Sequence, residues 1–309
     1  MTQFLAVVLS VLFWQGGVNT APELQKAGIT EIAVSVADSP QWHAITGISA
    51  RPLDVAGTVK LPAPGVALRI DEASASRVPW ISSNGWRFIR QPHAQFYYDV
   101  PANAVPLASA EAFCFGGETF IHTDSKGVEP LARMLAFLRT LNAETANPIA
   151  DIAFSDDGSP VSAEVMNLMV RDNLLFEIAP SSNVDSKLAV KIGSKDYPAG
   201  SVKDADSIVH KIRANLTDSQ RSVRLFGTSV VIARLTGKPD NLHLHLLNYG
   251  AGHIRVGGFR VRVLGRYSKS QIHSFDTPGE QLLDYEVQSD ATEFTIPELK
   301  TYAVVDLTH

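Results

Sequence analysis

Apolar and polar residues change their periodicity along the 309-residue chain, and the change predicts regions of different structure. Between residues 10 and 75, short apolar runs such as VLFWQGG, ITEIAVSV and GVALRI alternate with helical segments such as TAPELQKAG and SPQWHAIT. This alternation is typical of parallel strands joined by crossover helices. Helices over 106–115 and 128–141, with the strand ETFIHTD between them, continue the pattern. We therefore expect a β/α unit over residues 1–145.

The rest of the chain predicts two further domains. Over residues 148–216, IADIAFS, LLFEIAP and KLAVKIG are predicted strands, and Ser159 followed by Pro160 begins a helix. This composition predicts a small α/β domain, separated from the first by a linker at 142–148. From residue 222 helical signals end, and short alternating strands recur at intervals of about ten residues. That spacing predicts an antiparallel β-sandwich over residues 222–309.

The composition of the chain argues against some classes of binding partner. Hydrophobic residues make up 45% and charged residues 19%, as in ordinary folded proteins. The net charge of -5 and the absence of a basic run argue against nucleic acid as a partner. A single cysteine, Cys114, excludes an internal disulfide and a CxxC site. No apolar stretch is long enough for an integral membrane span, and the composition is compatible with an oligomer.

The apolar segment FLAVVLSVLF, from Phe4 to Phe13, has two interpretations. Its length suits the core of a signal peptide, in which case the protein is exported or periplasmic. Residues 1–3 carry no Lys or Arg, however, and no A-x-A cleavage site follows at the expected distance. The alternative is a buried first strand over Val8 to Trp14 that ends before Gly16. Both interpretations stay open, and localisation is not assigned.

Motifs of several enzyme classes are missing from the sequence. It contains no GxxxxGK[ST], GxGxxG, HExxH or GxSxG motif. Cys114 lies in a helical run, which favours a buried residue over a nucleophile. His243 and His245 share one face of a predicted strand, but no carboxylate or thiol lies at a matching position, so we expect a solvent-facing or partly buried pair. The sequence predicts neither a metal site nor a cofactor.

Carboxylates at predicted strand ends are the best candidates for chemistry. Asp71 and Glu72 follow VALRI, Asp99 follows FYY, and Asp124 follows TFIHT. In β/α barrels the carboxyl ends of the strands carry the active site. Glycoside hydrolysis needs two carboxyl groups about 5 to 10 Å apart, one protonated and one ionised. These four residues are the predicted catalytic candidates, although each could simply begin a loop or cap a helix.

Aromatic residues are concentrated between residues 78 and 101, which we expect to form strands joined by functional loops. Flat aromatic faces stack on the apolar faces of sugar rings and keep a polar edge at the rim. The alternative is that much of this cluster belongs to the core. Arg77 and His122 could add polar contacts. The predicted ligand-binding residues are Trp80, Trp86, Tyr97, Tyr98 and His93.

The order of these parts resembles the three-part glycosidases of the family 42 β-galactosidase type and related bacterial proteins. The resemblance rests on three stretches: AEAFCFGGETFIHTDSKGVEPLARMLAFLRTL, DIAFSDDGSPVSAEVMNLMVRDNLLFEI, and LHLHLLNYG with TEFTIPELKTYAVVDL. It implies a shortened (β/α) barrel-like unit, a small amidotransferase-like α/β unit and a C-terminal sandwich. The family's Asn-Glu pair is absent, so no catalytic residue is carried over. A full barrel also needs about 250 residues.

Three functions follow from this resemblance and from the residues. The first is a carbohydrate-binding protein that has the fold of a glycoside hydrolase without its chemistry. The second is a glycoside hydrolase that uses two carboxylates from the four strand ends. The third is an amidotransferase-like enzyme, for which Cys114 offers little support. Carbohydrate is therefore the expected partner.

Overall fold

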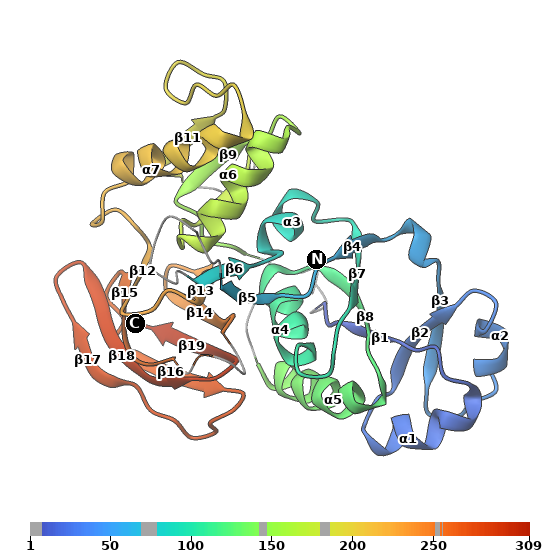
Figure 1. The fold of residues 1–309 in the computed structure, drawn as a ribbon. Helices are drawn as coiled ribbons and strands as arrows, with labels where there is room; N and C mark the ends of the chain where they lie inside the picture. Colours follow the sequence, from blue (N-terminus) through green and yellow to red (C-terminus); the bar gives the residue numbers. More distant parts are fainter. Residues whose placement is uncertain (1–7, 69–78, 142–146, 180–185, 251–253, 255) are drawn as a thin grey trace, which may run out of the picture. The chain divides into compact units, whose positions relative to one another are not determined.

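The computed structural model describes residues 8–68, 79–141, 147–179, 186–250, 254 and 256–309. The chain forms two compact units (Figure 1). Unit 1 consists of Met1–Pro64 and Gln91–Asn142, and unit 2 consists of Gly65–Arg90 and Ala143–His309. Both units are therefore interrupted in sequence, since the chain leaves unit 1 after Pro64 and returns at Gln91.

Unit 1 is built on a six-stranded sheet in which every neighbouring pair is parallel, in the order β3-β2-β1-β8-β7-β4. Its strands are β1 (Val11–Phe13), β2 (Glu31–Ser35), β3 (Ser49–Leu53), β4 (Val59–Leu61), β7 (Gln95–Asp99) and β8 (Glu118–His122). Its helices are η1 (Val18–Thr20), α1 (Ala21–Lys26), α2 (Ser39–Trp42), η2 (Val55–Gly57), α4 (Val105–Phe115) and α5 (Ser125–Thr140). The parallel sheet and the helices around 106–115 and 128–141 are confirmed.

The first strand, β1, lies in the middle of this sheet. Leu12 pairs with Ile32 on one side and with Ile121 on the other. All three residues of β1 are buried, as expected for a parallel strand covered on both faces. The interpretation of this segment as a buried strand is confirmed for Val11–Phe13.

The two faces of the unit 1 sheet carry different residues. On one face, the Tyr98 hydroxyl donates to Glu111 Oε2 at 2.6 Å, which places α4 over β7. α5 packs beside α4 and buries Leu131, Leu135 and Leu138, whose spacing of three or four residues forms one helical stripe. The opposite face carries a small apolar cluster of Val11, Phe13, Ala33, Leu53, Tyr97 and Phe120.

The order of the strands shows how far the unit 1 sheet agrees with the expected barrel-like unit. β1 and β8 are neighbours, with Val11 opposite Phe120, just as the last strand of a (β/α) barrel returns to the first. The steps from β1 to β2, β2 to β3 and β7 to β8 all lead in one direction across the sheet. Right-handed crossovers then place their helices on a single face. Within the described residues, however, β3 and β4 have one neighbour each, so the sheet is open and the barrel is not closed.

Unit 2 begins with a segment that the sequence pattern assigns incorrectly. GVALRI was expected to continue the parallel sheet, but β5 (Gly65–Leu68) pairs antiparallel with β6 (Pro79–Ser82) in a separate two-stranded sheet. Within the aromatic stretch, α3 (Gly85–Arg90) is a helix although strands and loops were expected. Phe88 and Ile89 are buried there, so packing outweighs their preference for strands.

A three-stranded parallel sheet forms the next part of unit 2, in the order β10-β9-β11. Its elements are β9 (Ile152–Ser155), α6 (Pro160–Arg171), β10 (Phe176–Ile178), β11 (Leu188–Lys191), η3 (Val202–Asp204) and α7 (Ala205–Asn215). Ser159 caps α6 by accepting a hydrogen bond from the Ser162 backbone N–H at 3.1 Å, and Pro160 occupies the first helical turn. The predicted helix start is therefore confirmed.

Two four-stranded antiparallel sheets complete unit 2, in the orders β12-β15-β18-β17 and β13-β14-β19-β16. Alternate residues of both sheets, such as Leu244 and Val261, belong to one apolar cluster, as period-2 strand patterns require. The described residues of this part contain no helix. The strands are β12 (Val223–Phe226), β13 (Val231–Lys238), β14 (Asn241–Asn248), β15 (Val256–Leu264), β16 (Lys269–Ser274), β17 (Leu283–Val287), β18 (Ala291–Leu299) and β19 (Tyr302–Thr308).

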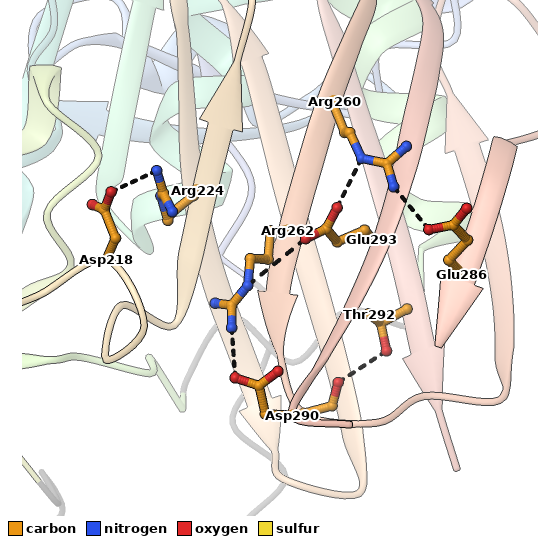
Figure 2. A network of polar contacts seen from close by, with 9 residues as sticks. Asp218, Arg224, Arg260, Arg262, Glu286, Asp290, Thr292 and Glu293 are labelled. Atoms are coloured by element: carbon orange, nitrogen blue, oxygen red, sulfur yellow. Dashed lines mark hydrogen bonds and ion pairs between the residues drawn. The ribbon is translucent and has the colours of Figure 1, made fainter. Parts of the chain in front are cut away.

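The faces of these two sheets that point away from the shared cluster differ in character. On the first, Glu293 lies between Arg260 and Arg262, which also pair with Glu286 and Asp290 (Figure 2). Opposite charges on neighbouring strands stabilise their pairing. Glu286 and Asp290 are largely exposed, whereas Arg262 is nearly buried.

On the second sheet, the two histidines of β14 that face away from the cluster are buried. His245 has no exposed surface and His243 is 4% exposed, whereas a solvent-facing or partly buried pair was expected. His245 Nδ1 lies 2.7 Å from the Tyr302 hydroxyl, and His245 Nε2 lies 3.0 Å from Thr236 Oγ1. Polar partners on neighbouring strands thus satisfy the ring in the interior.

Candidate functional site

The carboxyl edge of the unit 1 sheet brings together two polar side chains from neighbouring strands. Asp99 is the last residue of β7 and His122 the last residue of β8, and the two are register partners. His122 Nδ1 donates to Asp99 Oδ1 at 2.8 Å. Because paired residues of adjacent strands point to the same face, both side chains lie on the face of the apolar cluster. This is the edge at which β/α enzymes place their functional groups.

Aromatic rings lie beneath this pair. The Tyr97 ring stacks on the His122 ring with centroids 6.5 Å apart and an interplanar angle of 12°. Phe13 meets Tyr97 and His122 edge to face, at 5.6 Å and 6.2 Å. Burial, with a smaller contribution from the charge of Asp99, raises the pKa of Tyr97 above its usual value of 10. Tyr97 therefore stays a neutral phenol and serves as the floor of the site.

The Asp99–His122 pair is accessible. The side chain of Asp99 is 73% exposed and that of His122 is 26% exposed. Within the described residues, Asp99 Oδ2 and His122 Nε2 make no hydrogen bond. One acceptor and one ring nitrogen are therefore available to a ligand, while the Nδ1 contact fixes the ring orientation.

The amino edge of the same face has a different arrangement. Arg51 lies 3.6 Å from Glu31 and 3.3 Å from Glu118, and its guanidinium group lies over the Phe120 ring at 4.7 Å. These charges satisfy one another. At the carboxyl edge, by contrast, Asp99 and His122 keep accessible atoms with free hydrogen-bonding capacity.

Asp124 follows β8 and has a structural contact. Its Oδ1 accepts hydrogen bonds from the backbone N–H groups of Lys126 at 3.0 Å and Gly127 at 3.2 Å, so it caps the N-terminus of α5. Gly127 is required there because a Cβ atom would lie 2.1 Å from Thr123 Oγ1. Asp99 thus ends β7 and Asp124 follows the adjacent strand β8, but the two carboxylates differ in their surroundings.

The other residues predicted in unit 1 lie elsewhere. Tyr98 is fully buried against α4 on the opposite face of the sheet from Asp99. His93 is exposed and precedes β7, so it lies at the amino end of that strand, away from Asp99. Asp71 and Glu72 lie outside the described residues. The structure therefore brings Tyr97 to Asp99 and leaves Tyr98 and His93 apart from it.

The predicted tryptophans both belong to unit 2, on β6 and α3. The guanidinium carbon of Arg171 lies 3.3 Å from the centroid of the Trp80 ring, and that of Arg87 lies 4.3 Å from the Trp86 ring. Both indoles are partly exposed. Each thus has an arginine on one face, a contact that the sequence pattern did not indicate.

The turn after β9 contains a second polar arrangement in unit 2. Arg90 Nε donates to Asp156 Oδ2 at 2.8 Å and Arg90 Nη2 donates to Asp156 Oδ1 at 3.0 Å, a two-pronged contact between largely buried side chains. Asp157 accepts hydrogen bonds from Ser159 and Ser162, which lower its pKa to about 2. These aspartates are engaged in holding the start of α6.

Cys114 and possible metal-binding groups were the remaining candidates for chemistry. Cys114 is fully buried in α4, so its thiol is not positioned as an accessible nucleophile. No group of three or more His, Cys, Asp or Glu side chains is arranged to hold a metal ion in the part of the chain that the structure describes. In that same part, no helix is long and apolar enough to cross a membrane.

Comparison with known proteins shows what the fold of this chain is similar to, and nothing about its activity. No protein-family model and no curated protein match the sequence. Alpha-L-fucosidase isoenzyme 2 from Paenibacillus thiaminolyticus is similar over 82% of this chain and 65% of that one, with 10% identity and a TM-score of 0.53. A rhamnosidase from Novosphingobium sp. PP1Y is similar over 69% and 31%, with 11% identity and a TM-score of 0.46. This chain thus spans less than two thirds of either protein. The likeness to the fucosidase shows that its fold is glycosidase-like.

Proposed function

We propose that this protein binds carbohydrate and has a glycosidase-like fold without glycosidase chemistry. The observation that carries the proposal is the exposed Asp99–His122 pair, 2.8 Å apart, above the Tyr97 ring at the carboxyl edge of a parallel sheet. In this proposal the pair forms the polar part of a saccharide site.

The chemistry of the pair suits sugar hydroxyl groups. An ionised carboxylate accepts hydrogen bonds only, and Asp99 Oδ2 has no partner within the described residues. An imidazole whose Nδ1 is held by a carboxylate offers Nε2 to a ligand. Neighbouring hydroxyl groups of a sugar both donate and accept, so they match such a pair. Polar groups beside aromatic rings are the usual composition of small-molecule sites.

The surroundings of the carboxylates favour binding over hydrolysis. A glycosidase needs one carboxyl group in apolar surroundings, where it stays protonated, and a second that is ionised. Asp99 is exposed beside His122, and Asp124 is engaged with the backbone of α5. Neither has the surroundings of a general acid. A hydrolase that draws its pair from Asp71, Glu72, Asp99 and Asp124 is the alternative.

The proposal includes a three-part organisation over residues 1–145, 148–216 and 222–309. The apolar cluster shared by the two four-stranded sheets supports a C-terminal sandwich. The neighbouring strands β1 and β8 support a first part derived from a barrel. The family 42 β-galactosidase type is the arrangement that we propose it resembles. Because the chain is similar in fold to an alpha-L-fucosidase, L-fucose and its glycosides are suitable first probes.

Binding by the full chain to a glycan array, followed by calorimetric titration with L-fucose and L-rhamnose, tests this proposal. We expect Asp99→Asn and His122→Ala each to weaken binding at least tenfold. A matched control is Asp206→Asn, which removes another exposed carboxylate that pairs with a histidine, His210, at 3.3 Å. Equal binding by Asp99→Asn and the wild type would exclude this site.

A panel of chromogenic glycosides separates binding from hydrolysis. We expect no turnover by the full chain. Turnover that disappears in Asp99→Asn and persists in Asp206→Asn would establish the hydrolase alternative instead.

A further inference from the structure

A lysine lies on the same face of the unit 1 sheet as the Asp99–His122 pair. Lys60 is the middle residue of β4, the edge strand that pairs with β7. Its register partner is Tyr97, and register partners of adjacent strands point to the same face. Burial agrees with this placement, because Lys60 is exposed whereas Leu61, which points to the opposite face, is buried. Lys60 therefore projects from the face whose floor is Tyr97.

The position of Lys60 relative to Asp99 follows from the strand geometry. Asp99 comes two residues after Tyr97 and is thus the next residue of β7 on this face. With a rise of about 3.3 Å per residue and a strand spacing of about 4.8 Å, the Cα atoms of Lys60 and Asp99 are about 8 Å apart. A lysine carries its ammonium group on a long, flexible stem. The ammonium group can therefore contact a ligand that also contacts Asp99.

The charge of Lys60 is not neutralised by a neighbouring side chain. In the part of the chain that the structure describes, its ammonium group makes neither an ion pair nor a hydrogen bond, with Asp99 or with any other residue. The other cation among the described strand residues of this face is Arg51, which Glu31 and Glu118 engage at the amino edge. Lys60 is thus the cation on this face that stays available to a ligand.

Lys60, Asp99 and His122 together favour a ligand with two kinds of polar group. Asp99 Oδ2 and His122 Nε2 suit neighbouring hydroxyl groups, as argued above, whereas an ammonium group binds an anion most strongly. The anionic group must lie away from Asp99, because the two negative charges repel each other. A uronic acid meets both conditions, since its carboxylate and its hydroxyl groups are attached to different carbons of one rigid ring.

We propose that Lys60 makes the Asp99–His122 site selective for acidic saccharides, in which a carboxylate accompanies the ring hydroxyl groups. The inference rests on the proposed function for the site itself and adds the class of ligand. Lys60 determines specificity in this arrangement. It contributes little to the binding of a neutral sugar, which presents no charge to the ammonium group.

Calorimetric titration of the full chain with two matched pairs of sugars tests the role of Lys60. The pairs are D-galacturonate with D-galactose and D-glucuronate with D-glucose, whose members differ only in a carboxylate that replaces a hydroxymethyl group. We expect the acidic member of at least one pair to bind about fivefold more tightly at low salt, as one exposed ion pair allows. This preference should disappear at about 0.5 M sodium chloride, because salt screens exposed charges.

The decisive variant is Lys60→Gln, which keeps a polar side chain but removes the positive charge. We expect it to raise the Kd for the acidic sugar about fivefold, to leave the Kd for the neutral sugar unchanged, and to keep the melting temperature of the wild type. Lys26→Gln removes another exposed lysine of unit 1, in α1, and is the matched control that should keep the preference. An acidic preference that persists in Lys60→Gln would overturn the assignment to this residue.

The Asp99→Asn variant separates this inference from the proposed function. A neutral sugar that binds as tightly as its acidic counterpart, depends on Asp99 and is unaffected by Lys60→Gln overturns the selectivity and leaves the proposed function in place. Lys60 then serves only to discourage the edge strand β4 from pairing with another chain. Absence of any saccharide binding that depends on Asp99 overturns both proposals.

Discussion

His122 Nδ1 lies 2.8 Å from Asp99 Oδ1 because the two residues end adjacent parallel strands in the same register. A shift of either strand by one residue would turn one side chain to the opposite face. The contact between the two side chains therefore depends on the pairing of β7 with β8. Substitutions of either residue test whether this edge of the unit 1 sheet binds a ligand.

Replacing His122 with Ala should affect binding far more than stability. The side chain of Asp99 is 73% exposed, and exposed ion pairs contribute up to about 1 kcal/mol. We expect the free energy of unfolding to fall by about 1 kcal/mol or less while saccharide binding weakens at least tenfold. Denaturant unfolding and calorimetry on the same sample measure both. His210→Ala, which breaks an exposed pair in α7, should leave binding unchanged.

The buried His245 should make the stability of unit 2 depend on pH. Burial, aided by the nearby charges of His243 and Arg234, lowers the pKa of His245 from 6.5 to about 3. The unfolded chain takes up a proton below pH 6.5 and the native state does not, so stability falls as the pH decreases from about 6.5 towards 3. A single proton gives a slope of about 1.4 kcal/mol per pH unit, or about 2 kcal/mol by pH 5.

His245→Gln should remove this pH dependence, whatever it does to stability at pH 7. We expect the slope of the unfolding free energy between pH 6.5 and 5 to decrease by about one proton. His210→Gln, at an exposed position, serves as the control. Identical slopes for His245→Gln and the wild type would contradict the assignment.

Asp157 should titrate near pH 2 because of hydrogen bonds from Ser159 and Ser162. Its stabilising effect is complete above its unfolded pKa of 3.8 and is lost as the pH falls towards 2. Because Asp157 is exposed, solvent screening keeps that effect below about 1 kcal/mol. Ser162→Ala should raise the pKa of Asp157 towards 3.8. Carboxyl titration by NMR measures this, and an unchanged pKa would show that the Ser162 contact is not formed.

Arg90 should be a strong local determinant of stability in unit 2. Its two hydrogen bonds to Asp156 join side chains that are 16% and 15% exposed, and removal of one partner leaves a largely buried charge. We expect Arg90→Ala to lower the free energy of unfolding by about 2 to 3 kcal/mol, and Arg90→Lys to recover part of it without the second hydrogen bond. A double-mutant cycle with Asp156→Asn isolates the pair, and additive effects would rule out the contact.

The two tryptophans should differ in effect. The Arg171 guanidinium contact at 3.3 Å ties Trp80 to α6, so Trp80→Ala should cost about 2 to 3 kcal/mol of stability. Trp86 is partly exposed, and as a predicted ligand residue its change to Ala should weaken saccharide binding by about 1 to 3 kcal/mol without unfolding the chain. Melting temperature and saccharide affinity of both variants decide this. Large destabilisation by both would remove Trp86 from the predicted ligand-binding residues.

The sequence pattern correctly predicted those strands and helices in which the spacing of apolar residues coincides with the buried face. Leu242, Leu244 and Leu246 alternate along β14 and face the shared cluster. Leu131, Leu135 and Leu138 recur at helical spacing and are buried in α5. In such segments the side-chain pattern alone identifies the buried face.

The pattern of a single segment could not predict which strand it pairs with, or in which direction and register. The apolar residues of β5 fit a parallel or an antiparallel neighbour equally well, and β6, which follows it along the chain, decides the outcome. The sequence indicated Asp99 as a strand-end residue, but its contact with His122 depends on the register between two strands. Asp71 and Glu72 lie outside the described residues, so their prediction stays untested.

The position of β1 between β2 and β8 sets the order in which unit 1 can be completed during synthesis. Val11 pairs with Phe120, so one side of β1 has no partner on the ribosome until residues beyond 120 have emerged. Pairing at such long sequence separation slows folding, and an unpaired apolar strand edge promotes association with other chains. Synthesis should therefore pass through a stage at which a chaperone that binds extended apolar segments competes directly with β8.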